Sequence, residues 1–118
     1  MVRGRRREAG VGILHVVLFQ WRGTADTEAV ARMLARLAAL RTIAGVEWLE
    51  VGAELGLDAA RRAEGFSHAL VSRHVDAAAL ARYRADPDHL GLGPELATLA
   101  ERILVFDFPA GPARPAAD

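Results

Sequence analysis

The sequence predicts one α+β domain whose elements follow the order β-α-β-β-α-β. Its 118 residues are the length of a single domain. With 52% hydrophobic and 25% charged residues, the composition is that of a globular protein and excludes a disordered chain. Apolar residues alternate in some segments and follow a helical period in others, which indicates strands and helices in turn.

The first predicted strand spans residues 13–21, ILHVVLFQW, a short segment rich in β-branched and aromatic residues. Successive residues lie on opposite faces, and both faces are largely apolar. A strand with two apolar faces is covered on both sides. Because a chain of this length has helices for only one side of a sheet, we expect the second side to contact another subunit.

A helix is predicted next, over residues 24–41, because its apolar residues are spaced three and four apart. Thr24 or Asp26 can cap the start of this helix. Gly45 follows its end, where a glycine commonly terminates a helix.

Two strands and a connecting loop follow. The strand over residues 46–55 is predicted from alternation that places Val46 and Trp48 on one face. Residues 56–65 are polar and bracketed by glycines, which indicates a hairpin loop. The third strand is predicted over residues 66–74, FSHALVSRH.

The last third of the chain predicts two helices and a final strand. Asp76 can cap a helix that runs to Tyr83, and Pro94 begins a second helix that runs to Arg102. The segment 103–108, ILVFDF, is the last strand. This order is the ferredoxin-like split βαβ arrangement, an antiparallel four-stranded sheet with its helices on one face.

Residues 12–109 are the predicted folded domain. Residues 1–11 form an arginine-rich arm, which we expect to be disordered and solvated, with contact to an anion as the alternative. The tail, residues 110–118, is rich in proline, which disfavours both helix and strand, so we expect it to be disordered as well.

The composition also excludes several kinds of partner and of chemistry. Fifteen basic and fifteen acidic residues balance, which argues against a nucleic-acid or membrane-surface partner. The absence of cysteine excludes disulfides, thiolate nucleophiles and iron–sulfur ligation. No apolar run reaches the roughly 20 residues of a membrane helix. We therefore expect a cytoplasmic protein.

His89 and Tyr83 are the candidate catalytic residues. His89 lies in the first turn of a short helix that Asp86 and Pro87 can start, where the helix dipole disfavours a charged imidazole. A neutral histidine can act as a general base, although His89 could instead only hydrogen-bond a loop carbonyl. Tyr83 could donate to a developing oxyanion, or it could be half-buried with its hydroxyl at the surface.

The strand histidines His15 and His68 are flanked by apolar residues. They are either hydrogen-bonded core residues or the polar wall of a cavity between sheet and helices. Asp107 could orient a histidine or face solvent. The histidine spacings do not match those of metal sites, and no phosphate-binding loop is evident, so we expect no metal and no cofactor.

Four segments together resemble the stress-responsive A/B barrel domain (Dabb) family. They are HVVLFQWR from His15, GFSHALV from Gly65, DPDHLGLG from Asp86 and ILVFDF from Ile103, in order over residues 13–109. The resemblance implies a homodimer in which two ferredoxin-like protomers pack sheet to sheet as a dimeric α+β barrel. This agrees with the two apolar faces of the first strand.

Within that family the chain resembles olivetolic-acid-type polyketide cyclases, which close linear poly-β-ketones by aldol chemistry without metal or cofactor. Their catalytic histidine and tyrosine match His89 and Tyr83, and their pocket histidines match His15 and His68. The remaining implied substrate-binding residues are apolar: Val17, Phe19, Leu70 and Leu92. Several of these differ in size from the cyclase residues, so the substrate does not carry over.

The leading hypothesis is therefore a cofactor-independent cyclase that acts on a small polyketide or β-keto compound by histidine-based proton abstraction. One alternative is a non-enzymatic dimer that binds a small ligand or takes part in a stress response. Another is a dimeric scaffold whose cavity is filled by side chains such as Leu92 and Trp48.

Overall fold

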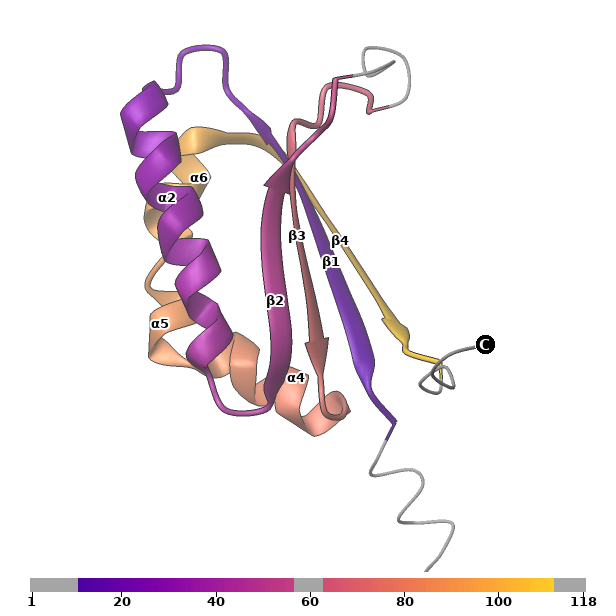
Figure 1. Cartoon of the computed structure of the whole chain (residues 1–118). Helices are drawn as coiled ribbons and strands as arrows, with labels where there is room; N and C mark the ends of the chain where they lie inside the picture. Colours follow the sequence, from indigo (N-terminus) through magenta and orange to yellow (C-terminus); the bar gives the residue numbers. More distant parts are fainter. Residues whose placement is uncertain (1–10, 57–62, 112–118) are drawn as a thin grey trace, which may run out of the picture.

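The computed structural model describes residues 11–56 and 63–111, which form an antiparallel sheet covered on one side by helices (Figure 1). The sheet order is β2-β3-β1-β4, and the order of elements along the chain confirms the ferredoxin-like prediction. The elements are β1 (Ile13–Trp21), α2 (Thr27–Ala39), a 3-10 turn η1 (Leu40–Thr42), β2 (Val46–Ala53), β3 (His68–His74), α4 (Ala77–Ala85), α5 (Pro87–Leu90), α6 (Gly93–Leu99) and β4 (Ala100–Pro109).

The helices begin at side-chain caps. Asp26, rather than Thr24, caps α2, since its carboxylate accepts from the Ala29 N–H at 3.0 Å. Asp76 caps α4 in the same way, accepting from the Ala79 N–H at 2.8 Å. The aspartates therefore set the entry of the chain into both longer helices.

The prediction was wrong about the junction between the last helix and the last strand. Helix α6 ends at Leu99, three residues before the predicted end, and β4 begins at Ala100. The reason is pairing in the sheet: Ala100 lies opposite Trp21 on β1, beyond an irregularity in the register between Gln20 and Trp21. Because they pair with β1, residues 100–102 belong to β4 and not to the predicted helix.

The prediction was also wrong about the faces of β2. Val46 lies opposite His74, but Trp48 lies opposite Arg73, because the register shifts between these two positions. One residue of shift turns every later side chain to the other side of the sheet. Trp48 therefore faces away from the helices and does not fill the space beneath them.

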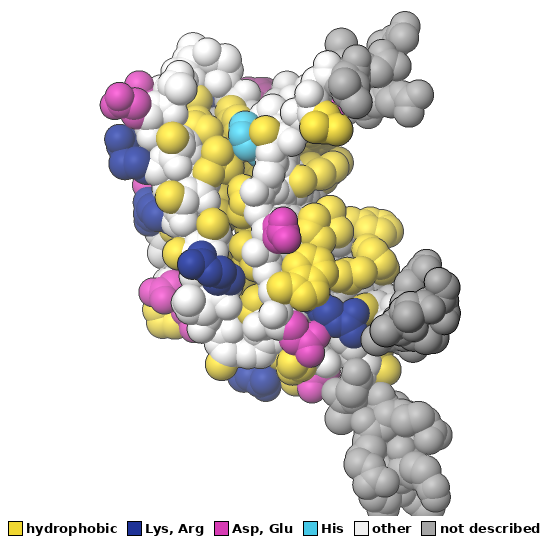
Figure 2. Space-filling model, in the orientation of Figure 1, with side chains coloured by type: hydrophobic (Ala, Val, Ile, Leu, Met, Phe, Trp, Pro, Cys, Tyr) yellow, Lys and Arg dark blue, Asp and Glu magenta, His cyan; other side chains and the backbone are white. Residues whose placement is uncertain are grey.

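The hydrophobic core lies between the sheet and the helices. Its most deeply buried members come from the helix-facing side of the sheet and from α2 and α4, and include Phe19, Met33, Leu70 and Tyr83. The opposite side of the sheet is also apolar, and Figure 2 shows hydrophobic side chains gathered there. Its exposed large residues are Trp48, Leu104, Phe106 and Phe108.

The predictions for the arginine-rich arm, for the middle of the 56–65 loop and for nearly all of the tail lie outside the described residues. Within the described ranges, no helix has the length and apolar character needed to cross a membrane.

Candidate functional site

A cavity of about 470 Å³ lies between the helices and the central strands. Strands β1, β3 and β4 supply its floor, and α2, η1, α4, α5 and α6 supply the remaining walls. Most of its lining is apolar. On β4, Ile103 and Val105 line it and remain partly exposed, so the cavity is open on that side.

Tyr83 and His89 lie side by side at this cavity. Tyr83 comes from α4 and His89 from α5, and the Asp86-Pro87 turn brings their ring centroids to 4.8 Å. Asp86 shapes this turn, because its carboxylate accepts from the Asp88 N–H at 2.9 Å and so begins α5. The structure thus places both predicted catalytic residues on one cavity wall.

Both residues are held in their neutral forms. Burial lowers the pKa of His89, and the electrostatic influence of the neighbouring His15 ring and of the Arg84 guanidinium lowers this pKa further. Burial raises the pKa of Tyr83 to about 12, so its hydroxyl keeps its proton at neutral pH. The sequence argument attributed the neutral state of His89 to the helix dipole, whereas burial is the larger cause.

His15 lines the same cavity and forms a hydrogen bond with a residue of β4. Its Nδ1 lies 2.5 Å from Oδ1 of Asp107, the residue opposite it in the β1–β4 register. The other oxygen of Asp107, Oδ2, accepts from Nη2 of Arg84 at 2.5 Å. Of the two roles considered for Asp107, the structure shows the orienting contact with a histidine.

His74 is a member of this cluster that the sequence argument did not single out. It is fully buried, and its ring centroid lies 4.7 Å from Tyr83 and 5.8 Å from His15. Its Nε2 is 2.9 Å from the Ser72 hydroxyl oxygen, while its Nδ1 is buried without a hydrogen-bond partner. Burial, more than any charge, lowers the pKa of His74 to about 4. Strand alternation from His68 could have found it, since both residues lie on one face of β3.

Three of the four apolar residues predicted to bind substrate line this cavity. Val17, Phe19 and Leu70 line the cavity. Leu92 is buried in the core but does not line this cavity; it borders a separate hollow beside Arg36 and Pro87. The space between sheet and helices is therefore not filled by Leu92.

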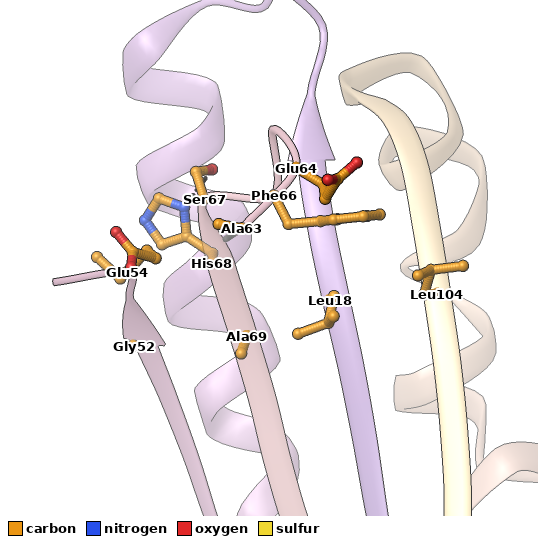
Figure 3. A pocket seen from close by; sticks show the side chains of 11 residues that line it. Leu18, Gly52, Glu54, Ala63, Glu64, Phe66, Ser67, His68, Ala69 and Leu104 are labelled. Atoms are coloured by element: carbon orange, nitrogen blue, oxygen red, sulfur yellow. Dashed lines mark hydrogen bonds between the residues drawn. The ribbon is translucent and has the colours of Figure 1, made fainter. Parts of the chain in front are cut away.

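His68 lies away from the cavity, at the start of β3. Its Nδ1 accepts from the Trp21 indole N–H at 3.0 Å and also lies 3.0 Å from the Ser67 hydroxyl oxygen, so this nitrogen is satisfied by neighbouring side chains. It borders a second hollow of about 380 Å³ near the end of the sheet, where Leu18, Ala69 and Leu104 lie on the side away from the helices (Figure 3). The structure thus separates His68 from His15, Tyr83 and His89.

Among the residues that the structure describes, no three potential ligand side chains are grouped closely enough to hold a metal ion. The chemistry available at the cavity is therefore that of imidazole, phenol, carboxylate and guanidinium groups.

Comparison with protein families matches the stress-responsive A/B barrel domain to residues 13–110. Comparison with curated proteins gives no match. Among solved structures, a hydroxynitrile lyase from Passiflora edulis is similar with a TM-score of 0.78 and 22% identity, covering 90% of this chain and 99% of that one.

Two bacterial structures are also similar. A dimeric ferredoxin-like protein from Thermobifida fusca has a TM-score of 0.74 and 25% identity, covering 86% of this chain and 92% of that one. A Dabb-family protein with a ferredoxin-like fold from Mesorhizobium loti has a TM-score of 0.70 and 23% identity, covering 86% of this chain and 99% of that one.

Proposed function

The chain belongs to the stress-responsive A/B barrel domain family, and we propose that it is a cofactor-independent enzyme that acts on a small polyketide or β-keto compound. The reaction is proton abstraction between two carbonyl groups, followed by intramolecular aldol ring closure. The observation that carries this proposal is the pairing of a neutral His89 with a protonated Tyr83 at one wall of an apolar cavity.

In this reaction His89 is the general base. Its neutral imidazole takes a proton from the carbon between two carbonyls, and the electron pair left behind forms an enolate. The Tyr83 hydroxyl donates a hydrogen bond to the oxygen on which negative charge develops. The enolate carbon then attacks a second carbonyl of the same molecule, and the new alkoxide takes the proton back from His89.

The cavity supports the proposal by its size and lining. A volume of about 470 Å³ lies in the range of roughly 300–1,000 Å³ that small-molecule sites occupy. The apolar walls can contact the carbon chain of a small polyketide in a bent conformation, and the few polar side chains can contact its carbonyl groups. Positioning the two ends of such a chain supplies part of the rate, so one base can suffice.

A similar fold carries lyase activity in another organism, as the name of the Passiflora edulis protein states. The reverse of an aldol closure is itself a carbon–carbon lyase step, and it needs the same base and the same oxyanion donor. We therefore include a lyase direction in the proposal, with the same roles for His89 and Tyr83.

The test is to incubate the purified protein with linear β-polyketide thioesters and to follow ring-closed products by mass spectrometry. We expect His89→Ala to lower turnover by about 10²–10⁴-fold, the usual worth of a general base. Arg82→Gln is the matched control, because Arg82 is an exposed residue of α4 that does not line the cavity. Wild-type turnover in folded His89→Ala would contradict the mechanism.

A second function, binding of an apolar small molecule without chemistry, is favoured by the predominantly apolar cavity lining. It predicts that a ligand binds with the same affinity to wild type and to His89→Ala. It also predicts that no substrate of the β-keto class turns over.

We further propose that the protein is a homodimer joined through the side of its sheet away from the helices. Trp48, Phe106 and Phe108 are exposed there, and burial of such apolar area stabilises association. The Thermobifida fusca structure is described as dimeric, which supports this assembly.

A further inference from the structure

Arg84 is a cationic residue at the wall of a largely apolar cavity. It follows Tyr83 in α4, lines the cavity, and has a half-exposed side chain. Its Nη2 donates to Asp107 Oδ2 at 2.5 Å, while Asp107 Oδ1 is 2.5 Å from His15 Nδ1. Three elements, α4, β4 and β1, are therefore linked through one carboxylate, and each of its oxygens has a nitrogen partner.

This linkage fixes the hydrogen-bonding character of His15. An ionised carboxylate can only accept hydrogen bonds, so His15 Nδ1 must carry the proton that it shares with Asp107. His15 is almost fully buried and lines the cavity, and with Nδ1 occupied its Nε2 is the nitrogen left to accept from a ligand. The direction in which His15 can hydrogen-bond thus depends on where the carboxylate is held.

We propose that Arg84 is a positioning residue of this site: its guanidinium holds the Asp107 carboxylate, which in turn holds the His15 ring in one tautomer at the cavity wall. The inference rests on the proposed function, in which the substrate occupies the cavity that His15 lines together with Tyr83 and His89. It adds a positioning role for Arg84 on α4, which acts on His15 of β1 through Asp107 of β4.

The same guanidinium acts on the general base by its charge. Arg84 lowers the pKa of His89, after burial and together with His15, whereas Asp86 and the backbone of Arg84 raise it. Arg84 also lowers the pKa of His74. Removing the positive charge is therefore expected to raise the pKa of His89, so that the base is protonated at a higher pH.

The test uses the full chain labelled with ¹⁵N and long-range proton–nitrogen spectra of its imidazole rings, which report tautomer and protonation directly. In wild type and in the Arg82→Gln control we expect His15 as the Nδ1–H tautomer. In Arg84→Gln we expect a mixture of His15 tautomers and a raised pKa of His89. Arg84→Lys restores the charge without the guanidinium fork, so the titration of His89 returns while the His15 mixture persists.

An Arg84→Gln protein with wild-type His15 tautomer and wild-type His89 titration would overturn the inference. Dispersed amide signals of Arg84→Gln itself show whether this variant is folded, and Arg84→Lys supplies a second, more conservative variant. These readouts need no substrate, so they judge Arg84 separately from the proposed reaction.

Once a substrate is identified, steady-state kinetics of Arg84→Gln also test the positioning role. We expect kcat of Arg84→Gln to fall by at least about tenfold with little change in KM, and the acid limb of the kcat/KM profile to move to higher pH. Unchanged kcat and acid limb would contradict the positioning role. If wild type turns nothing over, the proposed reaction fails while the spectra still decide the role of Arg84.

Discussion

The hydroxyl oxygen of Ser72 lies 2.9 Å from Nε2 of His74, and both side chains are fully buried. The bond satisfies one nitrogen of His74 and leaves Nδ1 without a partner. In the neutral ring, Nδ1 can be a lone pair that accepts no hydrogen bond. In the protonated ring, Nδ1 would be a buried N–H donor without an acceptor, which costs more. This pair therefore makes the core sensitive to acid.

The first prediction concerns stability at low pH. Burial holds the pKa of His74 at about 4, against 6.5 for an ordinary histidine. As pH falls below 6.5 the unfolded chain binds a proton that the folded chain does not, so stability is lost progressively down to about pH 4. At about 1.4 kcal/mol per pKa unit, the loss from His74 is at most about 3.5 kcal/mol.

Urea unfolding at pH 7 and at pH 5 measures this loss. We expect His74→Phe, which keeps a ring beside Tyr83, to lose less free energy of unfolding between the two pH values than wild type. Some loss remains in the variant, because burial also lowers the pKa of His89 and His68. Equal losses in both proteins would show that His74 is not the acid-sensitive group.

The second prediction separates the Tyr83 hydroxyl from its ring. Tyr83→Phe keeps the aromatic contacts with His74 and His89 and removes only the oxygen. We expect turnover to fall by about 10²–10³-fold, as for loss of one oxyanion donor, with a change of less than about 1 kcal/mol in unfolding free energy. Kinetics and chemical denaturation on the same preparation check both parts; turnover like that of wild type would remove Tyr83 from the mechanism.

The third prediction tests the dimer. Phe106 is 67% exposed, lies opposite Val16 in the sheet, and packs beside Phe108. Phe106→Glu puts a charge in the proposed interface, so we expect light scattering to give the mass of a monomer. Leu55→Glu is the control, since Leu55 is 82% exposed but lies beyond the end of β2. A dimeric Phe106→Glu protein would place the interface elsewhere.

The fourth prediction concerns the turn that leads into β2. Gly45 has φ of 93°, and an added Cβ would lie 2.8 Å from the Cβ of buried Ala79. We expect Gly45→Ala to lower the free energy of unfolding by about 1–3 kcal/mol, from backbone strain and from the clash. Gly23→Ala, where a Cβ meets no atom within 4 Å, is expected to be nearly neutral by the same denaturation assay.

Much of the fold was predictable because its signals are local. Short apolar segments located the four strands, helical spacing of apolar residues located α2, and Asp76 marked the start of α4. The bulge that turns Trp48 outward was not predictable, since it arises from pairing with β3. The early start of β4 at Ala100 likewise depends on its partner Trp21.

For the site, the sequence by itself determined that Tyr83 and His89 are six residues apart across one proline turn, so that they could face the same space. Only the tertiary structure decided that His15 and Asp107, 92 residues apart, share a hydrogen bond and that Arg84 completes it. It also decided that His74 joins the cluster while His68 pairs with Trp21 instead. The reason is physical: local spacing fixes which face a residue takes, whereas lateral register and helix packing fix which residues meet.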